Sequence, residues 1–168
     1  MAKKIMAWSE CEIEIGKTGA NDAMATSLTS IGTIKDKSSS LEPSEGDALE
    51  AKKTGGHTVA KEQQEGGFSL TTRVIEPEDS LLTTLGLGTA DTDEFKVKTH
   101  IVDGDFSVKV TPKNVGAKGI KAPKTNITYA PGWSEEEGNY ADLTFDILFG
   151  EQDYWYSRFT KKAAGGGS

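Results

Sequence analysis

The residue types that most often bind metals or act as nucleophiles are scarce in this sequence. Its 168 residues include one cysteine, Cys11, and two histidines, His57 and His100. A typical zinc site needs three or four ligands, mostly Cys and His, at motif spacing, and these three residues stand far apart in the chain. Cys11 could pair with a histidine as a nucleophile, but it occupies an apolar position of an alternating segment, where burial disfavours the thiolate. We therefore expect neither a zinc site nor a nucleophilic centre.

The remaining chemical motifs are weak. Residues 134–138, SEEEG, group carboxylates that could bind calcium, but they lack the Asp-x-Asp-x-Asp-Gly frame of a calcium loop, which favours a solvated loop. Residues 84–91, TLGLGTAD, superficially match a dinucleotide fingerprint but follow a helical pattern instead of preceding one. No G-x-S-x-G nucleophile elbow is present. The sequence predicts a protein that is not an enzyme and uses no cofactor; the enzymatic alternative is a metal-assisted hydrolase based on Glu135–Glu137.

The hydrophobic pattern has a period of two, which predicts a mainly β protein. Cys11, Ile13 and Ile15 alternate with Glu10, Glu12 and Glu14, which we call the glutamate ladder. Comparable alternation predicts strands over residues 66–77, 94–102, 103–112 and 140–150, and a weaker strand over 28–35. Residues 102–105, VDGD, are a tight-hairpin signal between two of these strands. Residues 118–132 contain Pro123 and Pro131 and fit an edge or bent strand.

One short helix is predicted over residues 76–88. Pro77 suits a first turn, Glu78 and Asp79 suit the positive end of the helix dipole, and Gly86 suits the C-terminal stop. The expected fold is a β-sandwich or β-barrel of antiparallel strands with one short flanking helix and a long arm. A single domain spans residues 1–162, and residues 163–168 look like a linker or cloning remnant. We expect no signal peptide and no membrane span.

Residues 36–67 form the expected arm. Residues 36–46 are rich in turn formers and should be irregular, whereas the segments on either side of Thr54-Gly55-Gly56 favour a polar hairpin. Such a hairpin buries little and is marginal in water by itself, so it needs a covering surface, and a second copy of the protein is the simplest one. The alternative is a disordered loop. The residues expected to make the contact are Leu49, Ala51, Lys52, Lys53, Val59 and Lys61.

The charges are divided along the chain. The net charge is -7 and the pI is about 4.9, which argues against a dedicated DNA binder. Residues 131–156 carry acidic but no basic side chains, and residues 96–124 carry seven lysines. Such a division fits copies that stack head to tail, and the uniformly acidic glutamate ladder fits a surface that keeps polyanions from adhering. The alternative is that both are simply solvated faces.

This layout of strands, one helix (EPEDSLLTTLG) and an extended arm resembles the bacteriophage tail tube (major tail) protein family and the related tube proteins of contractile injection systems. The resemblance covers about residues 6–156 and includes the phrases SSSLEPSEGDALEAKKTGGHTV and FSVKVTPKNVGAKGIKAPKTNITYAPGWSEEEGNYADLTFDILFG. It implies six-membered rings stacked into a hollow tube, with the arm contacting the next ring.

The resemblance also implies a place and partners for the protein. It would reside in the virion tail after assembly in the host cytoplasm, with tape-measure and tail-terminator or sheath proteins as partners, and DNA would pass through its lumen without specific binding. The lysine-rich run would lie on the outer wall or at the ring interface. The lumen-lining candidates are Glu10, Glu12 and Glu14, or alternatively Asp142 and Asp146.

A binding module is the alternative function. A β-sandwich of a virion or a secreted protein could recognise carbohydrate or protein through exposed aromatic residues. The same residues fit a strand that buries aromatic rings between subunits. These subunit-interface candidates are Trp133, Tyr154, Trp155 and Tyr156; Tyr140 is a further stacking candidate.

Overall fold

The protein is mainly β and antiparallel, as predicted. The computed structural model describes residues 4–8, 10–44, 46, 48–63 and 66–163. Within them, a single 3-10 turn (Ala20–Asp22), one α-helix and twelve strands follow in order: β1 Cys11–Lys17, β2 Thr29–Ser30, β3 Ser40–Pro43, β4 Ala48–Lys52, β5 Thr58–Gln63, β6 Phe68–Ile75, α1 Asp79–Thr84, β7 Gly88–Asp91, β8 Glu94–Val97, β9 Phe106–Pro112, β10 Lys118–Ser134, β11 Gly138–Ile147 and β12 Ser157–Thr160.

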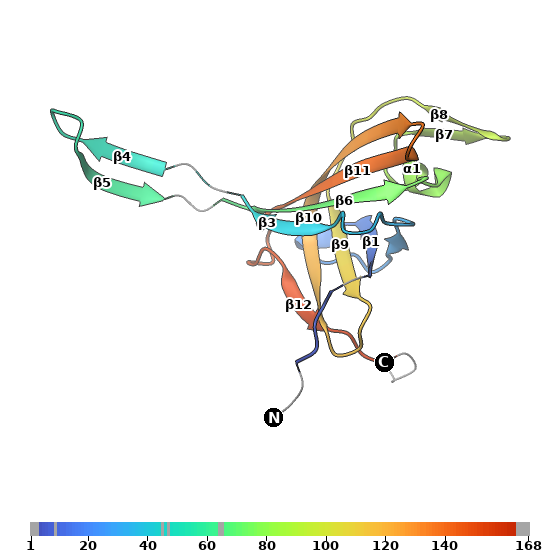
Figure 1. The fold of residues 1–168 in the computed structure, drawn as a ribbon, viewed down its shortest axis with the longest axis horizontal. Coiled ribbons are helices and arrows are strands. Elements are labelled where there is room, and N and C mark those ends of the chain that lie inside the picture. The colour runs from blue at the N-terminus through green and yellow to red at the C-terminus, as the bar shows by residue number, and fades with distance from the viewer. Residues whose placement is uncertain (1–3, 9, 45, 47, 64–65, 164–168) are drawn as a thin grey trace.

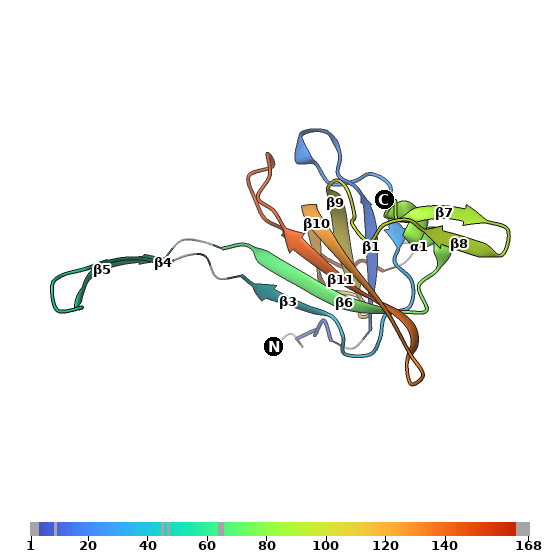
Figure 2. The ribbon, with the colours of Figure 1, turned by 90° about the horizontal axis from the view of Figure 1, so that it is seen from above.

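The body is one strongly curved sheet in the order β2-β1-β9-β10-β11-β6-β3, with β12 paired to β10 (Figures 1 and 2). The predicted alternation decides which residues face inward. Ile13 and Ile15 of β1 are buried, as are Leu143, Phe145 and Ile147 of β11. Their neighbours in sequence point outward, so one face of the sheet forms the core and the other meets solvent.

Residues 31–35 close the curved sheet into a barrel-like body. The backbone N–H of Ile31 donates to the Ile13 carbonyl at 3.0 Å, on β1. Four residues later, the N–H of Lys35 donates to the Arg73 carbonyl of β6 at 2.8 Å, and Ile34 bridges Val74. The segment thus joins the β1 side of the sheet to the β6 side. Closure of this kind covers strand edges that would otherwise be open.

The core contains Phe106, Phe145, Ile13, Leu143 and Val74, and α1 contributes Leu81 and Leu82. The helix is shorter than predicted, and its N-cap position is Glu78, so Pro77 precedes the first turn instead of occupying it.

The predicted stop at Gly86 is confirmed. Gly86 has φ +72°, its N–H donates to the Thr83 carbonyl at 3.0 Å, and the Leu87 N–H donates to the Leu82 carbonyl at 3.1 Å. This is a Schellman motif, which requires the left-handed conformation that glycine adopts without strain.

The predicted hairpin around residues 102–105 is wrong. The chain turns earlier, at Thr92 and Asp93, so that β8 pairs with β7, while β9 pairs with β1 and β10. Asp93 adopts a left-handed φ of 60° in this two-residue loop, and two residues is the commonest length of a hairpin connection. After β8, residue Ile101 forms only an isolated bridge with Thr128 of β10.

One further prediction needs correction, and another holds in one of its two alternatives. Residues 40–43 lie in a segment expected to be irregular, but they form β3, which pairs with β6; Pro43 is tolerated because β3 ends the sheet order, and proline is acceptable on an edge strand. The long strand β10 is bent, as predicted, with a register shift between Ala122 and Thr125 that contains Pro123. It is not an edge strand, because β9, β11 and β12 all pair with it.

The arm is a hairpin, as predicted. Strands β4 and β5 form a separate two-stranded sheet, and Gly55 and Gly56 in the turn have φ of +99° and +84°. Figures 1 and 2 both show the hairpin standing away from the body. Every residue of the hairpin whose burial is described, 48–62, is exposed. The hairpin is therefore formed but uncovered.

Candidate interaction surfaces

The hairpin arm carries a narrow apolar stripe on a polar ribbon. The register places Ala51 opposite Ala60 and Leu49 opposite Glu62, so Leu49, Ala51 and Ala60 share one face. Leu49 is 52% exposed and Val59 is 62% exposed. On the other face, Glu50 lies 3.7 Å from Lys61 and 3.8 Å from Lys52. All six residues proposed from the sequence for a contact with another copy, Lys53 included, are thus accessible for that contact.

The glutamate ladder lies beside lysines. Glu12 is exposed and Glu14 is half-buried on the outward face of β1. The register places Lys109 of β9 directly opposite Glu14, and the Glu10 carboxylate lies 4.0 Å from the Lys113 ammonium. The sequence shows the ladder as uniformly acidic, but the folded surface mixes the two signs, because strand pairing brings β9 alongside. Whether this surface faces a bore stays a prediction.

Asp142 and Asp146 differ in their surroundings. The Arg73 guanidinium donates two hydrogen bonds to the Asp142 carboxylate, at 2.6 and 2.9 Å, and a third to Glu137 at 2.8 Å. Asp146, exposed on the same face of β11, accepts a hydrogen bond from Ser69 at 3.3 Å. Asp142 is therefore neutralised by its neighbour, and of these two lumen-lining candidates Asp146 keeps the less compensated charge.

A cluster around Arg73 joins three segments that are far apart in the sequence. It contains Lys35, Glu137, Tyr140 and Asp142 as well as Arg73, and we call it the Arg73 cluster. Lys35 donates to the second Glu137 oxygen, and Tyr140 places its ring 4.2 Å from the Arg73 guanidinium carbon. Hydrogen bonds to Asp142 raise the pKa of Arg73. The hydrogen bond from Lys35, followed by the charges of Lys35 and Arg73, lowers the pKa of Glu137. These shifts favour the charged forms of Arg73 and Glu137, and the cluster fixes the β10–β11 turn to β6 and to residue 35.

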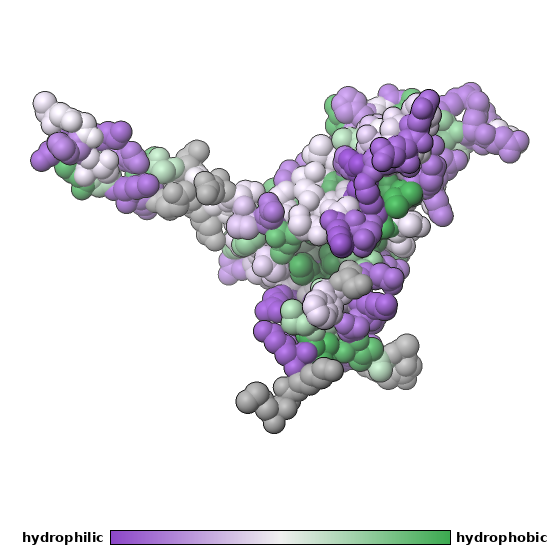
Figure 3. All heavy atoms as spheres, viewed as in Figure 1, coloured by the Kyte–Doolittle hydropathy of each residue, from purple (hydrophilic) through white to green (hydrophobic). Residues whose placement is uncertain are grey.

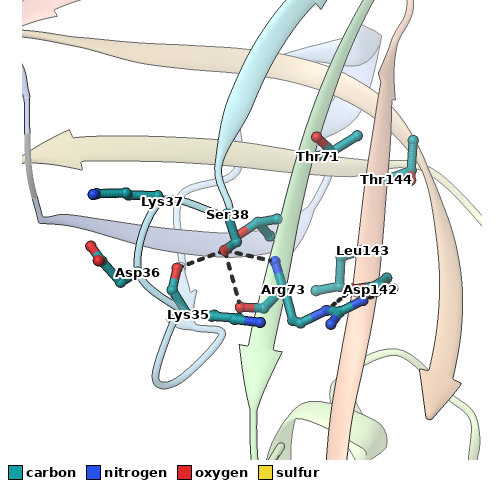
Figure 4. A pocket seen from close by; sticks show the side chains of 10 residues that line it. Lys35, Asp36, Lys37, Ser38, Thr71, Arg73, Asp142, Leu143 and Thr144 are labelled. Atoms are coloured by element: carbon teal, nitrogen blue, oxygen red, sulfur yellow. Dashed lines mark hydrogen bonds and ion pairs between the residues drawn. The ribbon is translucent and has the colours of Figure 1, made fainter. Parts of the chain in front are cut away.

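An open depression of about 590 Å³ lies beside this cluster (Figure 4). Figure 4 shows Arg73 and Asp142 joined at one side of it, and Ser38 bonded to the backbone of β6. The Ser38 hydroxyl is already engaged by the Lys35 carbonyl at 2.7 Å and the Arg73 N–H at 3.2 Å. The residues that line it are Lys35, Asp36, Lys37, Ser38, Thr71, Thr72, Arg73, Asp142, Leu143 and Thr144.

The residues considered for metal or nucleophilic chemistry lie apart. His57 lies in the arm and His100 follows β8, and both side chains are exposed. Cys11 is half-buried and packs against the core; burial raises the pKa of its thiol, and a hydrogen bond with Ser39 partly offsets this. Among the described residues, no group of three His, Cys, Asp or Glu side chains is arranged to hold a metal ion.

The lysines of residues 96–124 have varied partners. Lys124 lies 3.3 Å from Asp22 and 3.9 Å from Asp105. The pKa of Asp22 is lowered, first by the hydrogen bond from the Glu151 backbone and then by Lys124. Lys109 and Lys121 each lie 5.1 Å from the centre of the Phe159 ring. No local pattern in the sequence predicts this contact, because Phe159 reaches the two lysines through the pairing of β12 with β10.

The four subunit-interface candidates separate into two pairs. Trp155 and Tyr156 pack edge-on against Phe68, with ring centres 5.8 and 5.1 Å apart, next to the core of their own chain. Trp133 is 66% exposed at the end of β10 and Tyr154 is 37% exposed. Of these four candidates, Trp133 and Tyr154 thus present the larger aromatic surface to a partner.

Comparison with known proteins does not show a family for this chain. A scan against family models and a search of curated proteins both returned no match. In the part of the chain that the structure describes, no helix has the length and apolar character needed to cross a membrane.

Proposed function

We propose that the protein is a structural subunit that assembles with copies of itself into stacked rings, as the tube of a bacteriophage tail. The tube would be a conduit through which DNA leaves the virion. On this proposal the rings are hexameric, the tube grows in the host cytoplasm, and tape-measure and tail-terminator or sheath proteins meet it in the virion.

The uncovered hairpin arm is the observation that carries the proposal. Isolated two-stranded hairpins are marginal in water, and this one exposes Leu49 and Val59 instead of placing them on its own body. A neighbouring copy would cover the apolar stripe, and the separation of the arm from the body leaves it free to reach one. The barrel-like body would form the wall of the ring.

The sheet also offers edges for contacts within a ring. β2 and β3 end the sheet order, so each has one side without a strand partner among the described residues. Pairing between such edges would join neighbours and would remove the hazard of uncontrolled strand addition.

The carboxylates support passage of DNA without adhesion. At physiological salt the Debye length is about 8 Å, so charges on a bore wall act only close to the surface. Glu12 and Asp146 are exposed on the outward face of the sheet, where they would repel phosphate. Lys109, opposite Glu14, moderates this repulsion and would limit it to part of the wall.

A binding module is the second candidate, favoured by the exposure of Trp133 and Tyr154. The internal packing of Trp155 and Tyr156 weakens it, because the four aromatic residues do not gather into one stacking platform. A binding module would sediment as a monomer at every concentration, whereas a tube subunit forms rings or tubes as its concentration rises.

The test is replacement of residues 48–64 by a short Gly-Ser turn. The body should keep its cooperative thermal unfolding, since in the described part of the chain β4 and β5 pair only with each other, but stacking should be lost. Electron micrographs and sedimentation velocity compare the variant with the intact chain. Tubes formed by the arm-less variant would show that the arm is not the stacking element, and an intact chain that stays monomeric would reject the tube itself.

A further inference from the structure

The two ends of strand β10 carry opposite charges and exposed apolar side chains. β10 has 17 residues, from Lys118 to Ser134, which correspond to roughly 55 Å of extended chain before the bend is counted. In Figure 1 it runs from the lower end of the body, beside β12, to the upper right. The β9–β10 turn at one end and the β10–β11 turn at the other are thus held far apart by a single element.

The upper end is acidic and carries one large aromatic side chain. Trp133 is 66% exposed, and Glu135 and Glu136 follow it in the turn, both exposed. Neither glutamate lies within salt-bridge distance of a described basic side chain, whereas Glu137 is held by Lys35 and Arg73. The exposed tryptophan matters most, because tryptophan is enriched among residues that dominate binding energies.

The upper end is also held in a fixed shape. The Glu137 N–H donates to the Ser134 hydroxyl at 3.0 Å. Glu76 accepts from the Asn139 backbone N–H at 3.0 Å and donates its own N–H to the Asn139 carbonyl at 2.8 Å. A turn fixed in this way loses little conformational freedom on contact with a partner, which favours binding.

The lower end is apolar with a basic rim. Ile5, Met6 and Val115 are 51%, 44% and 52% exposed. They lie together: the Asn114 side chain donates to the Met6 carbonyl at 3.1 Å, and a Cβ added at Gly116 would come within 2.7 Å of Ile5. Figure 3 shows apolar surface at this lower end and hydrophilic surface around the upper end.

Lysines surround the lower patch. Lys113, Lys118 and Lys162 are exposed there. Lys161 also belongs to this end, since its ammonium donates to the Lys113 carbonyl at 2.8 Å. Glu10, 4.0 Å from the Lys113 ammonium, is the acidic group that an ion pair places beside them. The lower end therefore has an excess of positive charge around a surface that an indole ring could cover.

We propose that the upper end of one copy docks on the lower end of the next. Trp133 would cover the patch of Ile5, Met6 and Val115, and Glu135 and Glu136 would meet Lys113 and Lys118. The partner is a second copy because both halves of the contact are present on one chain with opposite charge. Surfaces at opposite ends of a molecule form a heterologous contact, which repeats without limit along a stack.

This contact is separate from the hairpin arm, but it rests on the proposed function, since both require copies to stack. It assigns two roles to two surfaces. The arm would hold the next copy along the stack, and the ends of β10 would set the direction in which one copy follows another.

Charge reversal tests the contact. Glu135→Lys with Glu136→Lys, or Lys113→Glu with Lys118→Glu, would place like charges at every junction, and the protein concentration needed for tubes should rise at least about tenfold. Combining all four substitutions restores opposite charges and should return this concentration to within about threefold of the wild-type value. Trp133→Ala should weaken stacking by removing apolar contact alone, with no rescue from the lysine substitutions.

The controls separate folding and arm effects from docking. Glu94→Lys with Glu151→Lys makes the same change of charge at exposed positions of β8 and of the loop after β11, neither of which belongs to the two ends of β10, and should leave stacking unchanged. Glu135→Gln with Glu136→Gln removes the charges without reversing them and should give a smaller effect. Thermal unfolding checks that each variant is folded, and sedimentation velocity with electron micrographs measures stacking.

Each outcome decides between the two proposals. If the end variants stack like the wild-type protein while the arm-less variant does not, the end-to-end contact is wrong and the proposed function stands. Loss of stacking in the Glu94 and Glu151 control to the same degree, or no rescue in the fourfold variant, also overturns the contact. An intact chain that never stacks overturns both.

Discussion

Replacing Leu49 and Val59 by serine removes the two large exposed apolar side chains of the arm and leaves its backbone pairing intact. Full burial of a leucine or valine side chain contributes about 1.5–3 kcal/mol. Leu49 is 52% exposed and Val59 is 62% exposed, so roughly half of this, about 1–1.5 kcal/mol each, is left for a neighbouring copy to recover. The two substitutions together should weaken the docking of one arm by about 2–3 kcal/mol, or about 30- to 150-fold in its association constant.

The assay is the protein concentration at which tubes appear, measured by sedimentation velocity and checked in electron micrographs. Several arms would act at each ring junction, so the shift should be at least as large as the value for one arm. Val97→Ser with Ile101→Ser is a matched control, since both side chains are exposed on the body, by 58% and 67%. A double arm variant that assembles within about threefold of the wild-type concentration would refute burial of Leu49 and Val59 between copies.

Three further predictions concern the body. Changing all three residues of the glutamate ladder to glutamine should spare assembly but increase retention of nucleic acid in a filter-binding assay; unchanged retention would mean that the ladder does not face the bore. Phe145→Ala empties a fully buried position and should cost about 3–5 kcal/mol of unfolding free energy in urea. Phe149→Ala, at a ring that is 52% exposed, should cost less than half as much, and equal costs would contradict the assigned core. Because Lys35 lowers the pKa of Glu137, its ion pair stabilises the fold above the ordinary glutamate pKa and is lost as pH falls through the lowered value. The melting temperature of Glu137→Gln should therefore change less than that of the wild-type protein between about pH 5 and pH 3, and parallel curves would remove the cluster from the acid response.

The strands with strict alternation could be predicted from the sequence because their pattern is local. In β1 and β11, the buried residues recur at every second position, and a shift of one residue would turn the whole set to solvent. The helix stop at Gly86 was predictable for the same reason, since a left-handed glycine after an apolar stripe is a local signal.

The features that were predicted wrongly or not at all depend on partners that are far away in the chain. Residues 102–105 and residues 92–93 both carry turn formers, and only the pairing of β9 with β1 and β10 decides that the hairpin forms at the earlier turn. β3 has no strong pattern of its own and becomes a strand because β6 offers it a free side. The closing segment, residues 31–35, is likewise set by its bonds to β1 and β6.

The candidate surfaces also divide into features that the local sequence predicts and features that depend on distant partners. That the arm is a hairpin followed from its glycines and polar composition, and the exposure of Leu49 and Val59 followed from the absence of a wider apolar face. The neutralisation of the Asp142 charge by Arg73 could not be predicted from the sequence, since the two residues are 69 positions apart. The packing of Trp155 on Phe68 within the chain could not be predicted either, because aromatic residues suit a core and an interface equally well.

The arm is continuous with the strands of the body. β3 leads into it and β6 leaves it, and the Ser44 N–H still donates to the Gly67 carbonyl, at 2.7 Å, beyond the last paired residues of these strands. A pull along the arm would therefore load the β3–β6 and β6–β11 ladders parallel to their strands, so that many hydrogen bonds share the force instead of opening one after another. If copies assemble as proposed, such a connection would pass tension from the arm's contact with a neighbouring copy into the sheet of its own subunit through main chain.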